Sequence, residues 1–381
     1  MLESLASPAP ARVLPPLSLI REVLQAAAPG AVDLALGEPG HAPPPAALAA
    51  MRDAAAEALE ARFSAAAAMR YTPNAGLPEL RAAVAQSRPF HGDAASVLIT
   101  VGSQQALALV SLGLLAAGDE VLIPDLAYPS YEALPALAGA RVRRAAWDRL
   151  EDSFSAHTRL VIVGSPSNPT GAVLSAARLA ALAEQAALCG AWILLDEIYA
   201  PLFDAAFVPL PASAGERVLL VGGVSKAFAL TGLRVGWLVA PPEVVARLLP
   251  VHQHLVTCAP RPAQQAALAA LASGDGTPAG ARELYAALRR RAIAGLGAIG
   301  GLRVDDPLGG YYLWVDARAR LGLATHAFAL DAARAGSVLV VPGEAFGPAG
   351  AGYLRLSVAA GEAAVDAGIA RLARALAGGV A

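Results

Sequence analysis

Short apolar segments alternate with alanine-rich, helix-like segments along most of this 381-residue chain, and this alternation constrains the fold more than any other feature. Short apolar runs separated by helices are typical of buried, mainly parallel strands. The candidate strands are residues 97–101, 120–124, 160–163, 192–195, 218–221 and 235–239. The candidate helices are residues 46–62, 78–87, 104–116, 130–138 and 175–188. The pattern predicts an α/β fold with a mainly parallel open sheet and helices on both faces.

The pattern changes after a long helical region at about residues 242–297. Residues 311–315, 338–341 and 353–358 are three more strand candidates with helices between them, which indicates a smaller α+β domain. Residues 1–35 are rich in proline and hold one short helical pattern at about 17–25, so they read as an arm. We predict an N-terminal arm with part of the small domain (1–36), a large α/β domain (37–275) and a small C-terminal α+β domain (276–381).

Composition limits the kinds of partner. The formal net charge of −2 gives no reason to expect a nucleic acid or another polyanion. The start, Met1-Leu2-Glu3-Ser4, lacks the basic and then apolar pattern of a signal peptide. The longest uncharged stretch, residues 98–118, is broken by a Gly-Ser-Gln-Gln turn and fits strand, turn and helix better than a membrane span. Cys189 and Cys258 form no zinc pattern. We expect a cytoplasmic protein without a metal or a membrane partner.

Lys226 is the only lysine among the 29 lysine and arginine residues of the chain. An amine can lose its proton and condense with an aldehyde, whereas a guanidinium cannot. Two interpretations remain open from the lysine alone. Lys226 forms a Schiff base, or an arginine-rich composition has left one lysine on the surface.

Polar residues follow several of the candidate strands, where open α/β sheets bind their ligands. Asn168, one of two asparagines, follows strand 160–163 and either faces a ligand or shapes its turn. The Gly102-Ser103-Gln104 turn opens a helix after strand 97–101, and its free N–H groups suit a phosphate, although most such turns bind nothing. Asp196 ends strand 192–195, where a buried acid needs a cation or donors unless it caps a helix.

Arg355 lies inside the apolar strand 353–358. A buried arginine usually pairs with a carboxylate, which comes either from a ligand or from the protein, for example Glu344 or Glu362. A second arginine, Arg234, lies eight residues after Lys226.

Taken together, these motifs resemble the class I/II aminotransferases, which are pyridoxal-phosphate (PLP) enzymes of fold type I. The resemblance covers nearly the whole chain. Its elements, in order, are Gly37-Glu38-Pro39, residues 71–81, Tyr128-Pro129-Ser130-Tyr131, Asn168-Pro169-Thr170-Gly171, Asp196-Glu197-Ile198-Tyr199, Ser225-Lys226 with Arg234, residues 341–347, and Arg355.

The resemblance implies roles around a PLP molecule. Lys226 would carry the cofactor as a Schiff base and later move the substrate proton. Asp196 would pair with the pyridine nitrogen, which makes the ring an electron sink. Asn168 and Tyr199 would hydrogen-bond the ring hydroxyl, and Tyr128 would stack on the ring.

The resemblance also implies how the phosphate and the substrate bind. The backbone N–H groups of Ser103 and Gln104, together with Ser225 and Arg234, would hold the phosphate. Tyr71 would reach the phosphate in the partner subunit's site, so the active unit would be a homodimer with shared sites. The substrate α-carboxylate would bind Arg355, helped by Asn168 and the Gly37 backbone.

The implied reaction moves an amino group from an L-amino acid to a 2-oxo acid, with 2-oxoglutarate as the expected acceptor, by a ping-pong mechanism. Three positions affect the details. Gly223 stands where many relatives have a serine for the phosphate. Gln104 stands where aspartate-preferring relatives can have a lysine, which disfavours a second substrate carboxylate unless an arginine elsewhere substitutes. His41 either faces the substrate side chain or lies in solvent.

Two other functions fit the same scaffold. A PLP-dependent β-lyase often has a histidine before the Asn-Pro pair, where this chain has Ser167. A non-catalytic PLP-binding regulator usually carries a DNA-binding segment ahead of this region, for which the short arm leaves no room. Alanine or glutamate, followed by absorbance, would separate these functions.

Overall fold

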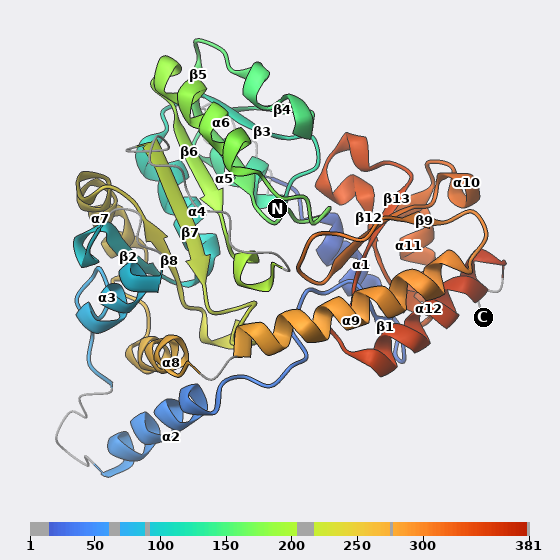
Figure 1. The fold of residues 1–381 in the computed structure, drawn as a ribbon, viewed down its shortest axis with the longest axis horizontal. Coiled ribbons are helices and arrows are strands. Elements are labelled where there is room, and N and C mark those ends of the chain that lie inside the picture. Colours follow the sequence, from blue (N-terminus) through green and yellow to red (C-terminus); the bar gives the residue numbers. More distant parts are fainter. Residues whose placement is uncertain (1–14, 61–68, 88–91, 204–216, 275–276, 379–381) are drawn as a thin grey trace, which may run out of the picture.

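The computed structural model describes residues 15–60, 69–87, 92–203, 217–274 and 277–378. The first residues of the predicted arm (1–14), the end of the predicted helix 46–62 and the last residues of the chain lie outside these ranges. The described chain forms a large domain around a seven-stranded sheet and a smaller domain around a four-stranded sheet (Figure 1).

The large sheet confirms the predicted mainly parallel α/β arrangement. Its strand order is β2-β8-β7-β6-β5-β3-β4, and only β8 runs antiparallel to its neighbours. The strands are β2 (Val97–Thr100), β3 (Glu120–Pro124), β4 (Arg141–Ala145), β5 (Thr158–Gly164), β6 (Trp192–Asp196), β7 (Val218–Gly223) and β8 (Gly236–Val239).

Helices cover both faces of this sheet because its central strands are apolar on both sides. In β5, Leu160 and Ile162 pack into one core with α4 and α7, whereas Val161 and Val163 pack into the other. Successive side chains of a strand point to opposite faces, so a continuous apolar run serves two cores. Across both domains, the α-helices of the described chain are α1 (Leu19–Ala26), α2 (Pro45–Glu60), α3 (Pro78–Ser87), α4 (Gly102–Leu114), α5 (Ser130–Leu137), α6 (Ala176–Cys189), α7 (Pro242–Val256), α8 (Arg261–Ala272), α9 (Thr277–Gly297), α10 (Arg318–Leu321), α11 (Thr325–Arg334) and α12 (Glu362–Leu376).

Two local features differ from the sequence pattern. Strand β4 was not predicted, because its sequence is Arg-Val-Arg-Arg-Ala and lacks an apolar run. The long helical region after residue 242 is three helices, since α7 ends before Thr257, whose φ is +66°, and α8 begins after Pro260.

The small domain is built on the antiparallel order β12-β13-β10-β9. These strands are β9 (Arg303–Val304), β10 (Tyr312–Asp316), β12 (Val341–Pro342) and β13 (Tyr353–Ser357). The arm joins this domain, because β1 (Val32–Asp33) pairs in parallel with β11 (Val338–Leu339). The predicted strand 338–341 is therefore two short strands in different sheets. In the view of Figure 1, helix α9 runs from the lower end of the large sheet across the small domain, beside α12. The predicted domain limits at residues 36 and 275 stay a prediction.

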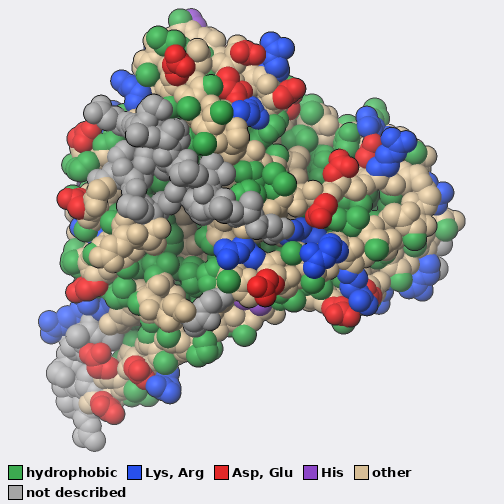
Figure 2. Space-filling view, viewed as in Figure 1, with side chains coloured by type: hydrophobic (Ala, Val, Ile, Leu, Met, Phe, Trp, Pro, Cys, Tyr) green, Lys and Arg blue, Asp and Glu red, His purple; other side chains and the backbone are tan. Residues whose placement is uncertain are grey.

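Two further observations concern the described part of the chain as a whole. No helix within it is long and apolar enough to cross a membrane. No group of three or more His, Cys, Asp or Glu side chains within it could hold a metal ion. On the face shown in Figure 2, acidic and basic side chains are interspersed.

Candidate active site

A cavity of about 290 Å³ opens beyond the carboxyl ends of the parallel strands, against the small domain and α1. It is lined by residues from the arm, from the loops that follow the strands, and from β10 and β13. Of the residues predicted for the site, those that line it are Gly37, Ser103, Gln104, Tyr128, Asn168, Asp196, Tyr199, Ser225, Lys226, Arg234 and Arg355. Residues far apart in sequence thus meet at one place, as the strand-end argument predicts.

Lys226 follows β7 and lies in this cavity, not on the open surface. Its Nζ donates a hydrogen bond to the carbonyl oxygen of Gly37 at 2.8 Å. Burial lowers the pKa of Lys226, and the positive charges of Arg355 and Arg234 lower it further. A lower pKa increases the fraction of neutral amine, which is the nucleophilic form.

Asp196 is the last residue of β6 and is only 6% exposed. Its Oδ2 accepts a hydrogen bond from the Tyr131 hydroxyl at 2.9 Å, and its Oδ1 accepts one from the Ile198 N–H at 3.0 Å. Burial raises the pKa of Asp196, while these two hydrogen bonds and the charge of Lys226 oppose the rise. Both hydrogen-bond donors are neutral, so this buried carboxylate fits a cationic N–H group in the cavity.

The first turn of α4 and Arg234 form a cradle of donors. The N-cap residue Val101 makes no side-chain cap, so first-turn N–H groups remain for a ligand. Gly102 has φ +72°, and a Cβ there would lie 2.5 Å from Arg234 Nη2. A Cβ on Gly236 would lie 2.5 Å from the Ser103 nitrogen. The backbones and the guanidinium approach so closely that only glycine fits, and together the donors suit an anion.

Arg355 lies in the middle of β13 and is 2% exposed. Its Nη1 donates to Asn168 Oδ1 at 2.9 Å and its Nη2 donates to the Ala35 carbonyl oxygen at 2.5 Å. Its guanidinium lies 4.0 Å from the ring centre of Tyr312 and 5.0 Å from that of Phe346. The Nε atom has no hydrogen-bond partner.

Among the described residues, Arg355 forms no ion pair with an internal carboxylate such as Glu344 or Glu362. Glu344 accepts hydrogen bonds from Thr325, and Glu362 pairs with Arg291. Across the described residues, Arg355 has only neutral partners, so its buried charge fits a carboxylate supplied by a ligand.

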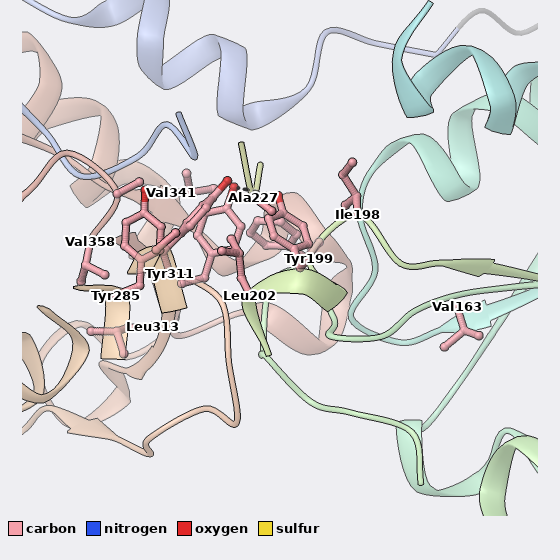
Figure 3. Close-up of a cluster of buried hydrophobic side chains, with 14 of the residues drawn as sticks. Val163, Ile198, Tyr199, Leu202, Ala227, Tyr285, Tyr311, Leu313, Val341 and Val358 are labelled. Carbon is pink, nitrogen blue, oxygen red and sulfur yellow. Dashed lines mark hydrogen bonds between the residues drawn. The ribbon is translucent and has the colours of Figure 1, made fainter. Parts of the chain in front are cut away.

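A group of tyrosines lies where the two domains meet (Figure 3). Tyr199 donates to the Tyr312 hydroxyl at 3.3 Å, and Tyr311 donates to the same Gly37 carbonyl that Lys226 binds, at 2.9 Å. His41 is partly exposed and is not among the residues that line the cavity. Its ring contacts the Tyr285 hydroxyl at 2.7 Å and the Ala227 carbonyl oxygen at 3.2 Å, and its two predicted roles stay predictions.

Gln104 and Tyr71, two other residues predicted for the site, differ in where their side chains lie. The Gln104 side chain accepts from the Tyr128 hydroxyl at 3.2 Å and donates to Ser130 Oγ at 2.8 Å. Tyr71 is 82% exposed and does not line the cavity of its own chain. Its predicted contact with a partner subunit stays a prediction.

Among the lining residues to which the sequence analysis assigned no role are Arg21, Tyr131 and Tyr312. Tyr131 belongs to the Tyr128–Tyr131 motif, so the sequence indicated that it lies near the site. The sequence did not indicate its hydrogen bond to Asp196. Arg21 reaches the cavity only because the arm packs on the small domain, and no local pattern in the sequence signals that.

The chain belongs to the aminotransferase class I and II family, whose model matches residues 29–375. It is 35% identical to an aspartate aminotransferase of Streptomyces avermitilis, over 81% of each chain. A Thermus thermophilus aspartate aminotransferase structure superposes with a TM-score of 0.86 at 30% identity, covering 97% of this chain and 100% of that one. The N-succinyldiaminopimelate aminotransferase of Mycobacterium tuberculosis superposes with a TM-score of 0.84 at 33% identity, covering 94% of this chain and 97% of that one.

These findings confirm the fold and the enzyme class. The chain has the fold of the fold-type-I PLP enzymes, and it is an aminotransferase. Enzymes of this family depend on PLP and act on small molecules.

Proposed function

We propose that this aminotransferase binds PLP through a Schiff base at Lys226 and transfers an amino group from an L-amino acid to a 2-oxo acid, 2-oxoglutarate being the expected acceptor, by a ping-pong mechanism. We further propose that it acts as a cytoplasmic homodimer. One observation carries the proposal. The only lysine of the chain, a buried carboxylate and a buried arginine without a carboxylate partner among the described residues all line one cavity.

The residues present fit PLP. Asp196 would hold the pyridine N–H, while Asn168 and Tyr199 would hold the ring hydroxyl. Tyr128 would pack on the ring. The α4 first turn (Ser103, Gln104), Ser225 and Arg234 offer donors for the phosphate. When bound, PLP supplies an electron sink for the electrons of a broken bond at the substrate Cα.

The chain's own residues would orient the substrate and move its proton. Arg355 and Asn168, already bonded to each other, would bind the α-carboxylate and fix which Cα bond faces Lys226. Lys226 Nζ would take the Cα proton, because its lowered pKa favours the neutral amine. The Gly37 carbonyl accepts from Lys226 and so holds the amine inside the cavity.

We propose that the substrate side chain is anionic. Four cationic side chains line the cavity, against one carboxylate. Three of them, Lys226, Arg234 and Arg355, have proposed partners, which leaves Arg21. Arg21 is exposed, and in the part of the chain described here no carboxylate forms a salt bridge with it, since neighbouring Glu22 pairs with His326. The relatives named for aspartate and for N-succinyldiaminopimelate support this choice. Arg21 therefore takes the place of the lysine that is absent at Gln104.

The test follows the absorbance of the purified, PLP-loaded protein. Borohydride should remove the Schiff-base band and leave an adduct that peptide mapping places at Lys226. Lys226→Ala and Lys226→Arg should both be inactive, because neither side chain forms an imine. A panel of donors, each added without acceptor, should convert the cofactor to its aminated form, with aspartate and glutamate ahead of alanine.

Each alternative function has its own result in this test. Release of pyruvate from a cysteine thioether, without the aminated cofactor, would show a β-lyase. No spectral change with any donor, despite bound PLP, would show a binding protein. Either outcome, or full activity of Lys226→Ala, would contradict the proposed function.

A further inference from the structure

The side chain of Arg144 joins the two domains. Arg144 belongs to the edge strand β4 of the large sheet, and its side chain is 19% exposed. Its Nη1 donates to the carbonyl oxygen of Phe346, in the small domain, at 2.9 Å and to that of Asp125, in the large domain, at 2.8 Å. Its Nη2 donates to Glu132 at 2.6 Å.

The Phe346 carbonyl is a junction between the two halves of the site. It accepts a second hydrogen bond, from the Ala127 N–H, at 2.9 Å. Ala127 directly precedes Tyr128, which lines the cavity on the large-domain side. The Phe346 ring is fully buried and lies 5.0 Å from the Arg355 guanidinium on the small-domain side. We call the Phe346 carbonyl with its donors, Arg144 and Ala127, the Phe346 junction.

The backbone at the junction leaves no space for adjustment. Gly347 has φ +139°, and a Cβ there would lie 2.2 Å from the Asp125 carbonyl oxygen and 2.5 Å from Arg144 Nη1. Contacts this short require the backbone to move. The loop that carries Phe346 is therefore held at one distance from the large domain.

We propose that Arg144 is a positioning residue for substrate binding: through the Phe346 junction it sets Arg355 at the correct distance from the cofactor side of the cavity. The inference rests on the proposed role of Arg355. The physical reason is that Arg355 makes its contacts with both domains, with Asn168 on one side and the Phe346 and Tyr312 rings on the other. A shift of the small domain changes all of them together, and small displacements of a binding group are costly.

The test compares Arg144→Met, which keeps side-chain length and loses the donors, with Arg143→Met on the opposite face of the same strand. Arg143 bonds Glu120 and the Ser153 carbonyl and does not contact the junction. The ligand is the 2-methyl derivative of the best donor, which has the α-carboxylate but no Cα proton to lose. Its dissociation constant is read from the cofactor spectrum. PLP retention on dialysis is the second readout.

Arg144→Met should weaken binding of the 2-methyl ligand by about tenfold, as expected for the loss of about one to two hydrogen bonds. KM should rise more than kcat falls, and PLP retention should stay as in the unaltered protein. Arg144→Lys should recover part of the loss. Gly347→Ala, which keeps the Arg144 donors but places a methyl group against Arg144 Nη1 and the Asp125 carbonyl, should weaken binding in the same direction. Arg143→Met should leave binding unchanged.

The outcomes separate this inference from the proposed function. Unchanged binding in both Arg144→Met and Gly347→Ala, with weaker binding in Arg355→Lys, would overturn the positioning role and leave the function intact. Equal weakening in Arg144→Met and Arg143→Met would also overturn it, because that result reports general loosening of the sheet edge. No weakening in Arg355→Lys would count against the proposed carboxylate site itself.

Discussion

Asp196 is a buried carboxylate whose hydrogen-bond donors in the described structure, Tyr131 and the Ile198 N–H, are neutral. If it holds the pyridine nitrogen of PLP, Asp196→Ala removes the anionic partner of the ring. We expect the half-reaction to slow by several orders of magnitude, since charge stabilisation in such sites contributes about 3–5 kcal/mol. Asp196→Glu should retain far more activity. Rapid-mixing absorbance with one donor measures both variants, and normal rates in both would reduce Asp196 to a turn cap.

Arg355 supports a prediction about substrate classes. Arg355→Lys keeps the charge and loses the two-pronged geometry, and Arg355→Ala loses both. Catalytic efficiency should fall in the order unaltered, Lys, Ala, with each step on the order of 1–3 kcal/mol, the range for a charged hydrogen bond. The loss should fall on amino acids and spare simple amines, which have no α-carboxylate.

The control for Arg355 is a paired assay with a melting curve. An amino acid and the amine that lacks only its carboxylate are compared in each variant. Equal loss on both donors, together with a lower Tm, would mean that Arg355 serves the fold and not the substrate.

Single residues differ in how far the sequence alone revealed them. A charge inside an apolar strand, as at Arg355, or at the end of one, as at Asp196, is visible because burial of an unpaired charge is costly. Tyr312 and Arg21 carry no such signal. Tyrosine is common in strands, and arginine is even more common on exposed helices, so neither residue stands out in the sequence. Their place in the cavity depends on how the small domain and the arm pack.

The carboxylate of Glu120 forms hydrogen bonds that link three neighbouring strands of the large sheet. Glu120 of β3 accepts hydrogen bonds from Arg143 of β4 at 3.0 Å and from Thr158 of β5 at 2.6 Å. Ser155, just before β5, donates to it at 2.8 Å. The hydrogen bonds from Arg143 lower the pKa of Glu120 to about 2, against the opposing effect of burial.

This network predicts a pH-dependent contribution to stability. A lowered folded-state pKa stabilises the fold above the unfolded pKa of about 4.5 and loses that effect as the pH falls toward 2. Glu120→Gln should lower the free energy of unfolding at pH 7 by on the order of 1–3 kcal/mol. The low end is expected because the Arg143 side chain is 38% exposed and therefore screened.

Urea unfolding between pH 7 and pH 3 measures the Glu120 effect. The difference between the unaltered protein and Glu120→Gln should shrink as the pH drops below about 4.5. Glu184→Gln, on the exposed face of α6, is the matched control and should show no such trend. A difference that stayed constant with pH would mean that the charge of Glu120 contributes nothing.

At the scale of elements, burial decides which strands a sequence reveals. The central strands β5, β6 and β7 are covered on both faces and appear as unbroken apolar runs. Strand β4 carries three arginines in five residues. It lies at the edge of the sheet, where long charged side chains reach solvent or the next domain, so its pattern gave no strand signal. Of those arginines, Arg143 binds Glu120, and Arg144 donates to the Phe346 junction.

At the scale of the whole molecule, the cavity lies where the large domain, the small domain and the arm meet. The family motifs located the site along the chain, but the relation of the two domains depends on contacts between distant segments. The bonds of Arg144 to Phe346 and of Asn168 to Arg355 are examples. One predicted residue, Tyr71, remains outside this single-chain site.

Tyr71 supplies the prediction for the assembled enzyme. Its side chain is 82% exposed, and its carbonyl oxygen accepts a hydrogen bond from Arg261 at 3.0 Å. A tyrosine side chain exposed to this degree is available for a contact with a second copy of the chain. If Tyr71 completes the phosphate site of the partner, Tyr71→Ala should weaken PLP retention, and Lys226→Ala should be inactive. Mixing the two should restore one working site per heterodimer, built from Lys226 of one chain and Tyr71 of the other. Subunit exchange is followed by mass, and activity by the donor half-reaction. A mixture that exchanges subunits but regains no activity would show that each site is complete within one chain.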